Sequence, residues 1–96
     1  QQADKILKEA EQKAQIIRDE AAKAAEAVRT EADLRGKKLV KDAEARGPIA
    51  VAAARKAADA LNKEADRKAS QLVAEADKKG DALLAEATAK TDELLK

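Results

Sequence analysis

An uninterrupted eleven-residue repeat constrains this chain more than any other feature. Starting at Ala3, the sequence divides into eight complete units and a partial ninth, residues 91–96, with no insertion between them. We letter the positions of each unit a to k. Position h is Ala in all eight complete units, position a is always Ala, Gly or Thr, and position d is always Ile, Val, Leu or Ala. A heptad pattern fails, because steps of seven from Ile6 reach Lys13 and Glu20.

Positions a, d, e and h of such a unit lie on one face of an α-helix. Eleven residues in three turns is about 3.67 residues per turn, so packed helices of this kind wind right-handed or stay nearly straight. A single amphipathic helix cannot bury its own apolar stripe. We therefore predict an all-α, self-associating hendecad coiled coil that occupies residues 1–96 as one segment. The predicted oligomer interface consists of Ala3, Ile6, Leu7, Ala10, Ala14, Ile17, Ala21, Ala25, Val28, Ala32, Gly36, Leu39, Val40, Ala43, Ala54, Ala58, Leu61, Ala65, Ala69, Leu72, Val73, Ala76, Gly80, Leu83, Leu84, Ala87, Leu94 and Leu95.

The polar positions also favour a helix. Position g is acidic in seven of eight units and position k is basic in six. An acid four residues before a base stabilises a helix by roughly 0.2–0.5 kcal/mol per pair. The predicted pairs are Glu9–Lys13, Glu31–Arg35, Asp42–Arg46, Glu64–Lys68, Glu75–Lys79 and Glu86–Lys90.

Gly47-Pro48 is the one helix-breaking pair. Pro removes a backbone hydrogen bond and disfavours helical geometry in the residue before it. Because the repeat keeps its phase across these residues, we expect one long helix with a kink. The alternative is an antiparallel hairpin, in which Gly47 ends the first helix in a left-handed conformation and Pro48 begins the second. A hairpin would place Arg18 near Asp77 and Arg29 near Asp66, although acids recur in every unit and any alignment would find partners.

Two groups of residues depart from the apolar pattern. Arg18, Arg29 and Asn62 occupy position e, either because e lies at the edge of the stripe, where Arg stems cover apolar surface, or because polar residues fix oligomer state and register. Asn62 is the candidate for the second role. The three glycines all fall at position a. They either allow close contact between helix backbones or replace Ala at a cost of about 1 kcal/mol each.

Composition argues against several classes of function. The chain has no Cys, His, Phe, Trp or Tyr, which removes the usual zinc ligands, a thiol nucleophile and base-stacking aromatics. Its carboxylates are evenly spread and accompanied by Lys or Arg, so no pair has the contrasting environments that acid–base catalysis needs. Basic and acidic residues alternate, which predicts no nucleic-acid surface, and no apolar run is long enough to insert into a membrane. We expect no enzyme activity, cofactor or metal, and the sequence indicates no compartment.

The repeat resembles known hendecad proteins. Gly36-Lys37-Lys38-Leu39-Val40-Lys41-Asp42-Ala43 is similar to the pattern of the right-handed coiled-coil stalk subunits of A- and V-type rotary ATPases. The chain also resembles uncharacterised Ala-rich hendecad proteins of bacteria and, more weakly, group 3 late embryogenesis abundant proteins. The first resemblance implies a stalk helix that pairs with another hendecad chain, and the last implies a stress-protective chain that is disordered when dilute. From the residues themselves we predict a self-associating rod or spacer, and the other two functions remain alternatives.

Overall fold

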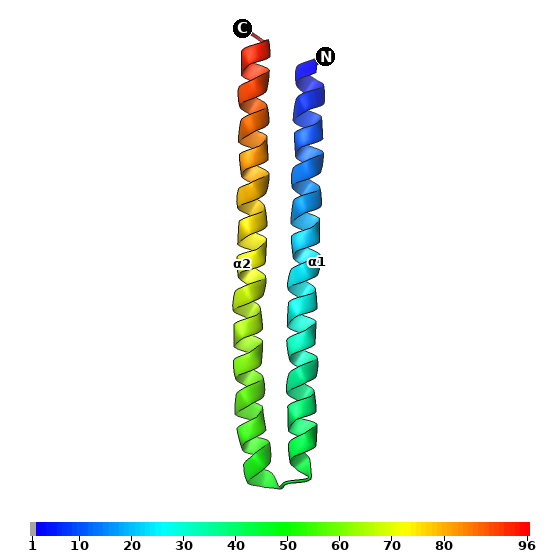
Figure 1. The fold of residues 1–96 in the computed structure, drawn as a ribbon, viewed down its shortest axis with the longest axis vertical. Coiled ribbons are helices and arrows are strands. Elements are labelled where there is room, and N and C mark those ends of the chain that lie inside the picture. Colours follow the sequence, from blue (N-terminus) through cyan, green and yellow to red (C-terminus); the bar gives the residue numbers. More distant parts are fainter. Residues whose placement is uncertain (1) are drawn as a thin grey trace. The chain divides into compact units, whose positions relative to one another are not determined.

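The computed structural model describes residues 2–96, and this part of the chain is all-α. Helix α1 spans Gln2–Glu44 and helix α2 spans Pro48–Leu94 (Figure 1). Both helices consist mainly of Ala, Glu, Lys, Leu and Arg, which have the highest intrinsic helix propensities. The two helices pack antiparallel. The predicted fold class, all-α, is confirmed.

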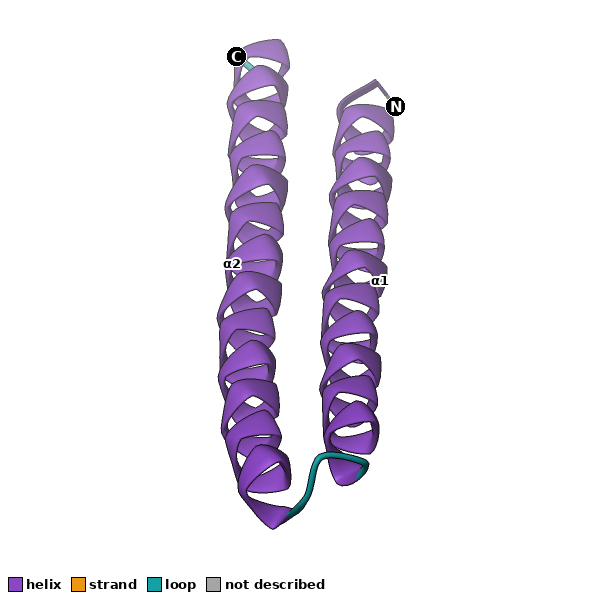
Figure 2. Ribbon diagram, turned by 60° about the horizontal axis from the view of Figure 1, so that its bottom comes forward, coloured by secondary structure: helices purple, strands orange, loops and turns teal. Residues whose placement is uncertain are grey.

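The chain reverses direction between Glu44 and Pro48, in the short loop drawn teal in Figure 2. Gly47 has φ of 106°, a conformation that glycine adopts freely and that strains any residue with a Cβ atom. The Gly47 carbonyl accepts a hydrogen bond from the Val51 amide at 3.1 Å and so begins α2. Pro48 follows as the first helical residue, where its missing N–H breaks no helical hydrogen bond. The prediction of one long helix with a kink at Gly47-Pro48 is therefore wrong, and the alternative, a hairpin turning at these residues, is correct.

Packing divides the chain into two compact units. The first unit combines α1 up to Lys23 with Leu72–Lys96, and the second is Ala24–Gln71, which contains the turn. Within each unit a stretch of α1 lies against a stretch of α2. Because both units repeat the same eleven positions, the same positions are buried in each.

The buried positions of both units are a and h, and together we call them the small-residue seam. Every buried apolar side chain in residues 2–96 is an alanine. Thr91 is also buried at position a, and its hydroxyl donates to the Thr88 carbonyl at 2.8 Å. The buried members of the seam are Ala10, Ala14, Ala25, Ala32, Gly36, Ala43, Ala65, Ala69, Ala76, Gly80, Ala87 and Thr91, while Ala3, Ala21, Ala54 and Ala58 are half-buried.

The large apolar side chains lie on the two sides of this seam. On a helix with this period, position d falls on one side of a and h, and position e falls on the other. We call them the d edge and the e edge. Within residues 2–96 no Leu, Ile or Val is buried, since each is either half-buried or exposed. The chain thus buries its small residues and leaves its large ones partly in solvent.

Candidate association surfaces

The e edge carries ion pairs that join α1 to α2. In the first unit, Arg18 reaches Asp77 through Nε at 3.4 Å and Asp81 through Nη2 at 3.1 Å. In the second unit, Arg29 Nε lies 3.2 Å from Asp66 Oδ1. The Arg18–Asp77 and Arg29–Asp66 pairs are those expected for a hairpin. Each is partly exposed and contributes about 0–1 kcal/mol, so these pairs contribute more to register than to stability.

The three glycines have three different neighbourhoods. A Cβ atom built on Gly36 would lie 2.9 Å from the Ala58 Cβ, so in the second unit this glycine permits close contact between α1 and α2. A Cβ atom on Gly80 would instead lie 3.1 Å from Nη2 of Arg18, so this glycine leaves room for the guanidinium group. Gly47 has open space around it and is required by its backbone conformation. Close contact between helices therefore accounts for Gly36 alone.

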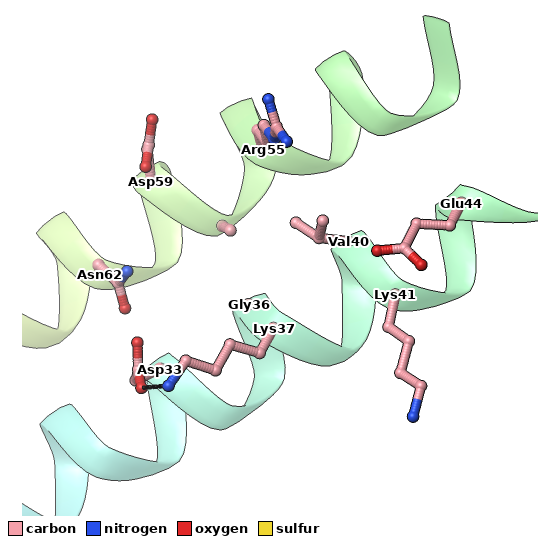
Figure 3. Close-up of a pocket in the computed structure, with 10 residues that line it drawn as sticks. Asp33, Gly36, Lys37, Val40, Lys41, Glu44, Arg55, Asp59 and Asn62 are labelled. Carbon is pink, nitrogen blue, oxygen red and sulfur yellow. Dashed lines mark ion pairs between the residues drawn. The ribbon is translucent and has the colours of Figure 1, made fainter. Parts of the chain in front are cut away.

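A groove of about 540 Å³ opens on the e edge of the second unit, near the turn (Figure 3). Gly36 and Ala58 form its floor, and Val40 is its one large apolar side chain. Asn62 from α2 and Asp33 from α1 point toward one another across it (Figure 3). The charged residues around it are Asp33, Lys37, Lys41, Glu44, Arg55 and Asp59, of which Lys37 pairs with Asp33 at 3.0 Å. Acids and bases are equal in number here, so the groove does not favour an anion or a cation.

The grooves on the d edge differ from the groove on the e edge in the residues that line them. In the second unit, a groove of about 330 Å³ lies between Val28 and Leu61, with Ala32 and Ala65 beneath them. Acidic and basic residues of positions g and k stand along its rim. These are Glu31, Arg35, Glu64 and Lys68. The groove therefore has an apolar floor and walls and a rim of alternating charge.

The first unit repeats this arrangement at the same positions. A groove of about 320 Å³ lies between Ile6 and Leu83, above Ala10 and Ala87. Its rim consists of Glu9, Lys13, Glu86 and Lys90. A third groove, of about 410 Å³, lies next to the turn in the second unit and includes Leu39, Ala43, Ala50 and Ala54. The eleven-residue repeat thus produces similar grooves on the d edges of both units.

On the outer surface, ion pairs join residues that are three or four positions apart on the same helix. Glu31–Arg35 at 3.3 Å and Glu86–Lys90 at 3.9 Å are the predicted pairs that form ion pairs within 4.0 Å in residues 2–96. Glu64 pairs with Arg67 instead of Lys68. The hydrogen bond that Arg67 donates, together with its positive charge, lowers the pKa of Glu64, and the same hydrogen bond raises the pKa of Arg67.

Sequence reasoning overlooked three apolar residues that lie outside the stripe. Ile49, beside the turn, is 89% exposed, and Leu34 and Ile16 are also exposed on α1. They occupy positions c and j, opposite the seam, where every other unit has a different kind of residue or Ala. Their only sequence signal is a large apolar side chain at a position that faces solvent. Single exposed apolar residues are common on protein surfaces.

Within the part of the chain that the structure describes, no group of three or more acidic, His or Cys side chains is placed to hold a metal ion. Neither helix has a stretch that is both long and apolar enough to cross a bilayer. Comparison of the chain with protein-family models, with curated proteins and with solved structures found no match. Its function must therefore be argued from the surfaces described above.

Proposed function

We propose that this chain is a structural element, a hendecad helical hairpin that associates with copies of itself and serves as a rod, spacer or oligomerisation module. One observation carries the proposal. The seam between α1 and α2 buries alanines, while no Leu, Ile or Val in residues 2–96 is buried. Burial of such a side chain stabilises a protein by about 1.5–3 kcal/mol, and much of this free energy is still to be gained when copies associate.

The proposal includes no catalytic activity, cofactor or metal. Its support is the surface chemistry of the helices, where acids and bases alternate and remain exposed. The Glu64–Arg67 pair illustrates this, since both residues lie on the outer surface of α2 and the largest perturbation of each pKa is the hydrogen bond with the other residue. The right-handed or nearly straight packing expected from the hendecad period applies to the assembly and stays a prediction.

Sedimentation equilibrium and circular dichroism over a concentration series test this function. We expect a strongly helical chain, a mass above the 10.2 kDa of one chain, and a melting temperature that rises with concentration, because association stabilises the folded state by mass action. An unordered spectrum in dilute buffer would contradict the proposal and indicate the stress-protective chain. A helical chain that stays monomeric until a second hendecad protein is added would contradict it too, and would indicate the stalk helix.

A further inference from the structure

The two edges of the seam differ in how many of their positions are apolar. In the second unit, the d edge consists of Val28, Leu39, Ala50 and Leu61, which are all apolar. The e edge of the same unit contains Arg29, Val40, Val51 and Asn62, so half of its members are polar. In the first unit the d edge is again entirely apolar, since it consists of Ile6, Ile17, Leu72, Leu83 and Leu94. The e edge of that unit has one polar member, Arg18, and its other members are Leu7, Val73, Leu84 and Leu95.

The e edge also carries ion pairs. The Arg18 side chain lies over Gly80 and reaches Asp77 and Asp81, so its stem and charged head occupy the part of this edge beside Gly80 in the first unit. Arg29 does the same toward Asp66 in the second unit. A partner that docked here would have to displace these side chains or remove their charges from water. Among residues 2–96, no ion pair crosses from α1 to α2 at the d edge.

From these observations we propose that a second copy of this chain docks on the d edge, so that two hairpins form a four-helix assembly and the e edges stay in solvent. This inference rests on the self-association proposed above and specifies its surface. The grooves between Val28 and Leu61 and between Ile6 and Leu83 have the form of the holes that receive side chains in coiled coils. The d residues of the second copy supply side chains of matching kind.

Charge complementarity favours a copy of the same chain over a strongly charged partner. The groove beside Val28 has two acids and two bases on its rim, and the groove beside Ile6 has the same number of each. Such a rim attracts neither a basic nor an acidic protein. A second copy offers the same alternation, and a shift of about one helical turn brings its bases opposite these acids. A two-fold symmetric interface requires this kind of self-complementary surface.

The large apolar side chains that remain partly exposed also favour a second copy of the chain as the partner. Leu39 on the d edge is 40% exposed and Leu94 is 51% exposed, and no large apolar side chain of residues 2–96 is buried. A copy that docks on the d edge covers Leu39 in the second unit, and one that docks on the d edge of the first unit covers Leu94. The seam itself offers no further apolar surface, because its alanines are already buried.

Two substitutions matched in exposure test the assignment. Leu39 on the d edge is 40% exposed and Val73 on the e edge is 38% exposed. We expect Leu39→Lys to weaken self-association at least about tenfold in sedimentation equilibrium, because a charge would be buried between copies. Val73→Lys should leave the dissociation constant within about a factor of two, and circular dichroism of both variants at low concentration checks that each hairpin is folded.

A second measurement keeps the inference testable if Leu39→Lys fails to fold. The chain has no Cys, so a single thiol can be placed at will. Leu61 and Asn62 are neighbours, both half-buried, on the d and e edges respectively. The reaction of Leu61→Cys with a maleimide should slow several-fold as the chain concentration rises, while the reaction of Asn62→Cys should not change.

The outcomes separate this inference from the proposed function. A wild-type chain that is monomeric at every concentration would overturn both. A wild-type chain that associates, with Val73→Lys weakened as much as Leu39→Lys or with the Asn62→Cys thiol protected in place of the Leu61→Cys thiol, would overturn only the choice of edge. Slow maleimide reaction of Leu61→Cys at all concentrations would mean that the hairpin itself covers the d edge, and would also overturn it.

Discussion

The contact between Gly36 and Ala58 gives the sharpest test of how α1 and α2 pack in the second unit. A methyl group on Gly36 would lie 2.9 Å from the Ala58 Cβ and 3.4 Å from its Cα. Carbon atoms at their optimal separation are about 3.5–4.0 Å apart, so the helices must move apart locally. Overpacking of this kind costs about 1–3 kcal/mol, whereas Ala in place of Gly within a helix gains about 0.5–1 kcal/mol. We expect Gly36→Ala to lower the free energy of unfolding by about 1 kcal/mol.

A double-mutant cycle isolates the contact from helix propensity. Ala58→Gly alone should destabilise the chain by about 0.5–1 kcal/mol, because it introduces a glycine into α2. Combined with Gly36→Ala, it removes the clash and restores one Ala and one Gly, so the double variant should match the wild type. The control is Ala60→Gly, at an exposed position two residues further along α2. Its effect should add to that of Gly36→Ala within about 0.3–0.5 kcal/mol.

Urea unfolding followed by far-UV circular dichroism measures these free energies, at one fixed chain concentration so that association contributes equally to every variant. If Gly36→Ala stabilised the chain by about 1 kcal/mol, as Gly to Ala does in an open helix, the close contact would be refuted. If Gly36→Ala and Ala58→Gly were additive, the two residues would not touch. Either result would mean that the small-residue seam is wider in solution than in the structure.

Three further predictions follow from single sites. Gly80→Ala should change the free energy of unfolding by less than about 1 kcal/mol, because the flexible Arg18 side chain can move aside and the lost ion pairs are offset by helix propensity; a larger loss in urea unfolding would show that Arg18 is held rigidly. Gly47→Ala should destabilise the hairpin by about 1–2 kcal/mol, since φ of 106° is strained for Ala, and an unchanged thermal transition would contradict this turn. The pKa of Glu64 should lie below its ordinary value in an NMR titration and rise again in Arg67→Gln. Because a lowered folded-state pKa adds stability above the unfolded-state value, that contribution is lost as pH falls through the folded-state pKa, and a Glu64 pKa unmoved by Arg67→Gln would contradict the pairing.

The eleven-residue period correctly indicates the helices and the apolar stripe that contains positions a, d, e and h. It does not indicate which of the four stripe positions is buried most. Ala14 and Ala69 are fully buried, whereas Leu39 and Leu94 remain exposed, because two helices in contact cover only the middle of a stripe this broad. The width of the seam depends on the number of helices that meet, and the sequence of one chain does not state that number.

The turn is the main difference from the sequence-based prediction, because a continuous phase of the repeat fits two structures. The phase is continuous across Gly47-Pro48, which suggested one long helix. In a hairpin with a loop this short, however, the level at which α2 begins decides which of its residues meet α1. Keeping the phase places Val28 opposite Leu61 and Gly36 opposite Ala58, so that like positions face each other. A continuous phase is therefore compatible with both structures, and the local chemistry of Gly47 and Pro48 decides between them.

The ion pairs show a similar limit. The Arg18–Asp77 and Arg29–Asp66 pairs follow directly once the hairpin is known. Within one helix, Glu64 binds Arg67 where Lys68 was expected. Exposed pairs three and four residues apart differ by only a few tenths of a kcal/mol, so their spacing predicts which residues are neighbours and not which pair forms.

Small residues at the seam have a consequence for the rest of the chain. Because alanines let α1 and α2 approach closely, the larger side chains lie on the flanks, where neither helix covers them completely. Leucines at the seam would hold more apolar surface within one hairpin, but they would also separate the helices and remove the grooves beside Val28 and Ile6. The alanines of the seam, which add little apolar burial to a single hairpin, thus leave the larger side chains of the d edge for a second hairpin to bind. For this reason the close packing at the seam and the exposure of the d edge depend on each other, and a measurement of self-association tests both.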